Sequence, residues 1–288
     1  MRALGSRDVF DAPRRCHLSW PLAGNGAPLL LIQGTGVGGE TWRPQIDALQ
    51  EEFACLSFDN RGFGASQPLA GALSVERMAD DAIALMDAQG WETAHVAGHS
   101  LGGLVAQFVA NKVRRRVRSL SLLCTISKGA DATTLTGWHL RIGLRTAIGT
   151  KRMRRRAFLE MVFTEAEIAE LRDFDGACER LACLYGHDLA TQPSISMKQL
   201  RAMAKADATP FLPAFAGLPT LVVTATHDRI TRPACGRAIA AAIPGARYVE
   251  LDSARAAPIT RSTELNAVLR EHLVAAEREW RAASVAAG

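Results

Sequence analysis

Short apolar runs alternate with amphipathic stretches along the first part of the chain. Residues 29–33 and 54–58 form two continuous apolar runs that end at turn residues, which predicts two buried strands. Residues 41–52, between them, carry the apolar spacing of a helix. The pattern continues with a predicted helix at 74–89, strand at 94–97, helix at 101–112 and strand at 119–124. This alternation predicts a mostly parallel, doubly wound α/β sheet with helices on both faces.

The alternation stops after residue 126 and returns near residue 211. Residues 127–210 are rich in charged and helix-forming residues and contain no clear strand. Strand-like runs reappear at 220–225 and 247–251, and an amphipathic helix is expected at 262–277. The sequence therefore predicts one α/β core made of residues 1–126 and 211–288, interrupted by a helical cap insertion at 127–210.

The composition narrows the function classes. The formal net charge is +5, and much of the excess lies in basic runs at 112–118 and 151–156. Neither run is interleaved with aromatic residues, so we expect helix surfaces and no nucleic-acid binding. No stretch reads as a signal peptide or membrane span. The six cysteines lack metal-site or disulfide spacing, so we expect a cytoplasmic protein with no metal and no cofactor.

The sharpest local signal is a glycine-flanked serine between a predicted strand and a predicted helix. Residues 98–103 read Gly-His-Ser-Leu-Gly-Gly, with Ser100 at the turn. Glycines let such a turn close without Cβ clashes, and the strained backbone presents the serine oxygen at the carboxyl edge of the sheet. The helix N-terminus there favours developing negative charge. Ser100 is therefore a candidate nucleophile.

With this motif the chain resembles the α/β-hydrolase superfamily, over about residues 28–273. Residues 33–36 (Gln-Gly-Thr-Gly) lie where that family has an oxyanion loop, and residues 59–66 are similar to its Asp-x-Arg-Gly-x-Gly-x-Ser loop. The resemblance implies an α/β-hydrolase fold. It further implies a set of roles: nucleophile Ser100, catalytic acid Asp228, oxyanion-hole N–H groups of Thr35 and Leu101, substrate-site residues Gln33 and Gly34, and loop-bracing residues Asp59 and Arg61.

The resemblance breaks at the catalytic histidine. The family's histidine lies about eleven residues before a helical Asn such as Asn266, and that position here is Arg255. A guanidinium is always charged and accepts no proton, so Arg255 cannot be a general base. We expect it to form a bidentate ion pair with Asp228; the alternative is that it binds a carboxylate or phosphate of the substrate.

Seven histidines could in principle replace the missing base. His227 adjoins Asp228, and two histidines of the cap, His139 and His187, could reach the site from above. His99 adjoins Ser100, although family members bury that residue behind the sheet. His17, His95 and His272 are expected at the surface or in packing. None of these alternatives is favoured by the sequence.

Three functions fit these residues. The first is hydrolysis of an ester, thioester, lactone or related acyl compound by Ser100. The second is a lyase, isomerase or cyclase reaction that uses the same pocket, and the third is ligand binding without turnover. The mixture of apolar residues and arginines in the cap favours a small, partly apolar substrate with an acidic group. Nothing in the sequence indicates an oligomeric state.

Overall fold

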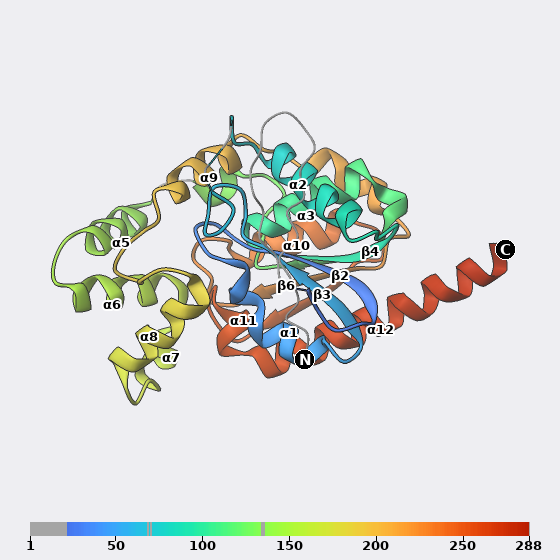
Figure 1. Ribbon diagram of the computed structural model, residues 1–288. Coiled ribbons are helices and arrows are strands. Elements are labelled where there is room, and N and C mark those ends of the chain that lie inside the picture. The colour runs from blue at the N-terminus through green and yellow to red at the C-terminus, as the bar shows by residue number, and fades with distance from the viewer. Residues whose placement is uncertain (1–21, 68, 70, 134–135, 288) are drawn as a thin grey trace.

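The molecule is built around one seven-stranded sheet, described by a computed structural model for residues 22–287 except 68, 70, 134 and 135 (Figure 1). The strand order is β1-β3-β2-β4-β5-β6-β7, and every neighbouring pair is parallel except β1 with β3. The strands are β1 (Leu22–Ala23), β2 (Ala27–Ile32), β3 (Phe53–Ser57), β4 (Ala94–His99), β5 (Val117–Leu123), β6 (Thr220–Ala225) and β7 (Arg247–Leu251).

Helices cover both faces of this sheet and form the insertion between β5 and β6. The α-helices are α1 (Arg43–Leu49), α2 (Val75–Ala88), α3 (Leu101–Lys112), α4 (Ala130–Thr133), α5 (Gly137–Ala147), α6 (Lys151–Val162), α7 (Glu165–Ala169), α8 (Phe174–Tyr185), α9 (Ile195–Ala204), α10 (Pro233–Ala242), α11 (Ala257–Thr260) and α12 (Ser262–Ala287). Short 3₁₀ helices occupy Gly39–Trp42, Arg114–Arg116 and Thr209–Phe215.

The core divides into two layers because successive side chains of a strand point to opposite faces. On β2, Leu30 and Ile32 pack into the layer beneath α2, α3 and α10. Leu29 and Leu31 pack into the opposite layer, beneath α1 and α12. All four leucine and isoleucine side chains are fully buried, as expected for a parallel sheet covered on both faces.

The predicted α/β-hydrolase architecture is confirmed, but the edge strand β1 and helices α10 and α11 were not predicted, and α12 is longer than predicted. The edge strand β1 pairs antiparallel with β3 and has only two residues, too few to give a periodic signal. Helix α12 continues to Ala287, ten residues beyond the predicted end at 277. Its last turns extend away from the body of the molecule (Figure 1), and the Arg118 guanidinium stacks over the Trp280 ring at 3.8 Å.

A buried polar cluster fastens α12 to the sheet. The Glu277 carboxylate accepts from His95 Nε2 at 3.1 Å, Arg118 at 2.9 Å and Arg281 at 2.7 Å, while His95 Nδ1 lies 2.8 Å from the Ser119 hydroxyl. Burial acts to raise the pKa of Glu277, but these hydrogen bonds outweigh it and lower the pKa to about 2. His95, which the sequence placed at the surface or in packing, is thus a buried packing residue, and both of its ring nitrogens have hydrogen-bond partners.

The helices α4–α9 form the insertion, which we call the cap segment (residues 127–210). It has its own apolar cluster, built on Phe158, Leu159 and Tyr185, and Val37 and Ala256 of the core join that cluster. The cap segment therefore packs over the carboxyl edge of the sheet (Figure 1). Within the described part of the chain, no helix combines the length and apolar character needed to cross a bilayer.

Candidate active site

Ser100 occupies a strained turn between β4 and α3. Its backbone has φ 58° and ψ −121°, in a region that non-glycine residues rarely adopt. Its N–H donates to the Leu123 carbonyl at 2.9 Å, and its carbonyl accepts from the Thr125 hydroxyl at 2.5 Å. A Cβ at Gly98 would lie 2.2 Å from the Gly102 carbonyl oxygen, so only glycine fits there. The nucleophile-like turn predicted at Ser100 is formed.

Asp228 follows β6 and is held by a tight turn. Its Oδ1 accepts from the N–H groups of Ile230 at 2.8 Å and Thr231 at 3.0 Å, and its Oδ2 accepts from the Thr231 hydroxyl at 2.5 Å. The side chain is wholly buried. Asp228 thus serves as a turn residue and also presents one carboxylate oxygen towards the site.

Arg255 joins Asp228 to Ser100. One guanidinium nitrogen donates to Asp228 Oδ2 at 3.3 Å and to the Thr231 hydroxyl at 3.0 Å, and the other donates to Ser100 Oγ. The expected ion pair between Arg255 and Asp228 is formed, but its expected bidentate geometry is wrong, because the second nitrogen of the guanidinium donates to the serine instead. The arginine therefore lies between the serine and the acid, where a triad histidine would lie.

None of the histidines that the structure describes forms a hydrogen bond with Ser100. His227 is exposed and lies 3.0 Å from the Asp252 carboxylate, so this alternative for the missing base is contradicted. His99 is half-buried and lines the cavity of Ser100 instead of lying behind the sheet, and its Nε2 donates to the Arg255 carbonyl at 3.1 Å. Burial and the nearby Arg255 charge lower the pKa of His99 to about 3, so its neutral ring is a very weak base.

The remaining candidates lie in the cap segment or outside the described residues. His139 and His187 line the cavity that contains Ser100, but neither forms a hydrogen bond with it. The His139 ring bonds to the Thr136 hydroxyl at the start of α5. His272 is buried in packing, and His17 lies outside the described residues.

The predicted oxyanion loop lies beside the serine. A Cβ at Gly34 would be 3.1 Å from Ser100 Cβ, which shows how closely the loop approaches. Gly34 and Thr35 line the Ser100 cavity. Gln33 does not; it is buried, with its backbone carbonyl bonded to Asn60 at 2.7 Å. Leu101 begins α3 directly after the serine and is fully buried.

The loop predicted to brace the site does so. The Asp59 carboxylate accepts from the N–H groups of Gly39 at 2.8 Å and Ala65 at 3.0 Å. Arg61 forms a buried ion pair with Asp81. These contacts fix the loop after β3 next to the oxyanion loop, and neither Asp59 nor Arg61 lines the cavity of Ser100.

A cavity of about 640 Å³ opens above Ser100, between the core and the cap segment. Ser100, Arg255 and the loop at Gly34–Val37 form its floor. Its roof comes mainly from apolar side chains of α6 and α9, including Phe158, Val162, Met197, Leu200 and Met203. Among the described residues, the only charged side chains in its wall, apart from histidines, are Arg255 and Arg201. The cavity therefore suits a small, largely apolar molecule, and its fixed charge is positive.

Two residues at this site had escaped the sequence reasoning. Thr231 binds both Asp228 and Arg255, and a Thr three residues after an Asp is a turn signal that could have revealed it. Gln199, on α9, accepts from the Gly36 N–H at 2.7 Å and ties the cap segment to the oxyanion loop. No local pattern could have indicated that contact, because the two residues are 163 positions apart.

Known proteins share this architecture. A family profile described as alpha/beta hydrolase fold matches residues 27–143. The chain is 31% identical over 235 residues to "Putative carbamate hydrolase RutD" of Azorhizobium caulinodans, covering 82% of this chain and 86% of that protein. Among solved structures, a hydrolase from Pseudomonas aeruginosa PA01 is 25% identical with a TM-score of 0.78, covering 94% and 99% of the two chains. The enol-lactonase from Burkholderia xenovorans LB400 is 26% identical with a TM-score of 0.76, covering 91% and 100%.

Proposed function

Because the chain belongs to the α/β-hydrolase superfamily, we propose that it cleaves an acyl bond of a small, largely apolar molecule by attack of Ser100. The supporting observation is the placement of Arg255, whose guanidinium contacts both Ser100 Oγ and Asp228. The superfamily supports an enzyme of the hydrolase fold. The serine mechanism and the substrate class are our proposal.

Arg255 acts on the serine through its charge. A cation beside Oγ favours the alkoxide over the hydroxyl through its charge, without accepting the proton itself. The Ser100 proton passes to hydroxide from solvent, and the alkoxide forms a bond to the acyl carbon. The carbonyl oxygen then carries the negative charge, and the N–H groups of Thr35 and Leu101 stabilise it. Collapse expels the leaving group, and hydroxide then hydrolyses the acyl-enzyme.

The same geometry selects the substrate. In a complete triad the histidine returns its proton to the leaving group, but Arg255 cannot do so at ordinary pH. A leaving group must therefore depart as a stable anion, as thiols, phenols and enols do. We infer that thioesters, aryl esters and enol esters or lactones are the preferred substrates, and that alkyl esters and amides react poorly. Two of the similar proteins are named for acyl substrates, a carbamate and an enol-lactone.

Steady-state kinetics with acetate esters test this mechanism. We expect kcat/KM for p-nitrophenyl acetate to rise in proportion to hydroxide between about pH 7 and 10, because no group of the protein takes the proton. It should also fall steeply from p-nitrophenyl to phenyl to ethyl acetate. Ser100→Ala should reduce the rate to the level without protein, and a fluorophosphonate should label Ser100 more rapidly at higher pH. Equal activity of Ser100→Ala and the unaltered chain contradicts the proposal.

A second function is supported by the exposure of Arg255 to the cavity. There the guanidinium would bind the carboxylate of a small molecule. That molecule would either undergo a lyase, isomerase or cyclase reaction or be bound without turnover. In that case Arg255→Ala impairs turnover or binding more than Ser100→Ala does. The same pair of variants therefore separates the two functions.

A further inference from the structure

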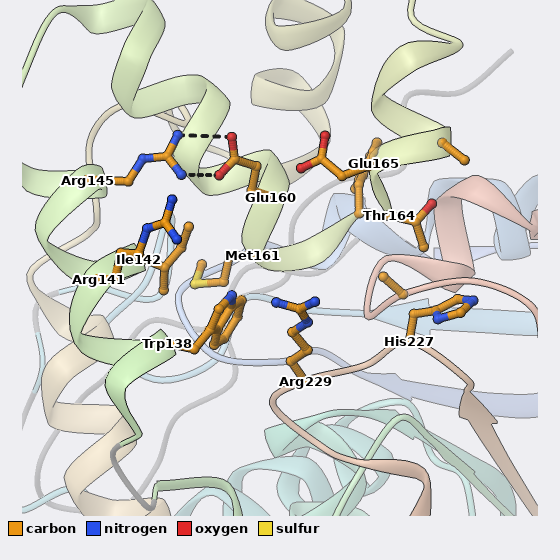
Figure 2. A pocket seen from close by; sticks show the side chains of 13 residues that line it. Trp138, Arg141, Ile142, Arg145, Glu160, Met161, Thr164, Glu165, His227 and Arg229 are labelled. Atoms are coloured by element: carbon orange, nitrogen blue, oxygen red, sulfur yellow. Dashed lines mark hydrogen bonds and ion pairs between the residues drawn. The ribbon is translucent and has the colours of Figure 1, made fainter.

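A second cavity, of about 490 Å³, lies on the other side of α5 from the site of Ser100. Its walls are α5, the end of α6, the start of α7 and the loop that follows β6 (Figure 2). Neither Ser100 nor Arg255 lines it. Met161 lines both cavities, while Trp138 faces the second cavity and the next residue, His139, faces the first. The two spaces are neighbours with a shared wall.

Positive charge remains unpaired in this second cavity. The acidic side chains in its wall are Glu160 and Glu165, and both are bound by arginines: Glu160 by Arg145 and Arg156, and Glu165 by Arg156 at 2.5 Å. In contrast, Arg141 and Arg229 have no carboxylate partner in the described ranges of the chain. Two guanidinium groups are thus available to an outside anion, and each presents N–H pairs that match a carboxylate or phosphate.

An apolar surface lies beside these cations. The Arg229 guanidinium lies over the Trp138 ring, 5.4 Å from its centroid, and the two side chains lie next to each other in the wall of the cavity (Figure 2). Ile142 and Met161 continue the apolar wall. A flat apolar body can rest on this surface while its acidic group reaches the guanidiniums.

We propose that this cavity binds a small organic anion, an aromatic or apolar body that carries a carboxylate or phosphate, separately from the site of Ser100. Arg141 and Arg229 bind the acidic group, and Trp138 contacts the body. The site does not depend on the acyl chemistry proposed above.

Isothermal titration calorimetry with benzoate and phenyl phosphate tests the site. We expect both probes to bind the unaltered chain, and phenol and inorganic phosphate to bind more weakly than phenyl phosphate. Arg141→Ala and Arg229→Ala should each weaken binding by about tenfold to a hundredfold, the loss expected for one charge-assisted contact. Trp138→Phe should retain most of the affinity, and Trp138→Leu should lose it.

Arg115→Ala is the matched control, because Arg115 is exposed and lines neither the second cavity nor the cavity of Ser100. It should leave both affinities unchanged. Loss of binding in Arg115→Ala, equal binding by the Arg141→Ala/Arg229→Ala double variant and the unaltered chain, or no binding at millimolar probe overturns the proposal. None of these readouts requires turnover, so the outcome is independent of the esterase measurements.

Discussion

Replacing Arg255 with histidine supplies the one group that the site lacks. Asp228 is already oriented by the N–H groups of Ile230 and Thr231, and its Oδ2, which now accepts from Arg255, would become available to a ring N–H. The opposite ring nitrogen would then face Ser100 Oγ, the atom that Arg255 contacts now. The variant thereby converts a serine held by a cation into a serine with a base.

The expected gain is large because the histidine acts in both half-reactions. A positioned general base or acid contributes about 10²–10⁴-fold to rate, so kcat/KM for p-nitrophenyl acetate should rise at least about 100-fold at pH 7.5. The pH dependence should change as well. In place of a continuous rise with hydroxide, activity should level off above the pKa of the new histidine, which lies near or somewhat above about 6.5 beside a carboxylate.

The assay is stopped-flow or steady-state release of p-nitrophenolate, with two controls. Arg255→Lys keeps a cation and adds no base at neutral pH, so it should stay close to the unaltered chain. Ser100→Ala in the Arg255→His background should remove the gain. If Arg255→His is folded by circular dichroism, is labelled by fluorophosphonate and still gains nothing, the absence of a base does not limit this site and our reasoning is refuted.

Three further changes test the forces that hold the site and fold together. Asp228→Asn leaves the Arg255 guanidinium without its buried carboxylate partner. The free energy of unfolding in urea should fall by about 3–5 kcal/mol, reduced by the solvation that the partly exposed arginine retains. An unchanged urea midpoint would rule out a stabilising ion pair. Gly102→Ala places a Cβ 2.0 Å from the Ile32 carbonyl oxygen and should cost at least about 1–3 kcal/mol, with loss of Ser100 labelling at matched temperature. Glu277 has a pKa lowered to about 2, so its contribution to stability is complete above its ordinary pKa near 4.5 and disappears as the pH falls from there towards 2. Glu277→Gln should flatten the urea midpoint over that interval, and an unaltered pH dependence would contradict the assignment.

Structure that depends on neighbouring residues could be predicted from the sequence. Residues 220–225 and 247–251 are strands β6 and β7 with the predicted bounds. The β6 run is apolar apart from two threonines and is wholly buried, and such a run between turn residues has few other stable conformations. The turn at Ser100 was predictable from the glycines that flank the serine. Glycine is required at residue 98 because a Cβ there would meet the Gly102 carbonyl, and at residue 102 because a Cβ there would meet the Ile32 carbonyl of the neighbouring strand.

Side-chain placement at the site was less accessible. The sequence located Arg255 in the histidine position and paired it with Asp228, but it gave no means to see that the fork also contacts Ser100, 155 residues away. It could not exclude His227 either, because a ring beside Asp228 can turn either way until the surrounding loops are placed. The end of α12 depended on contacts with the sheet, among them that of Arg118 with Trp280.

By itself, the sequence determined the alternation of strands and helices through most of the core, the site of the strained serine and the absence of histidine at residue 255. Those properties depend on periodicity and on backbone sterics over a few residues. Tertiary structure alone decided where the long guanidinium side chains point, which histidines face solvent and that a second, arginine-lined cavity exists behind α5. A flexible side chain has many rotamers of similar energy, and only packing and charge from distant segments select one of them.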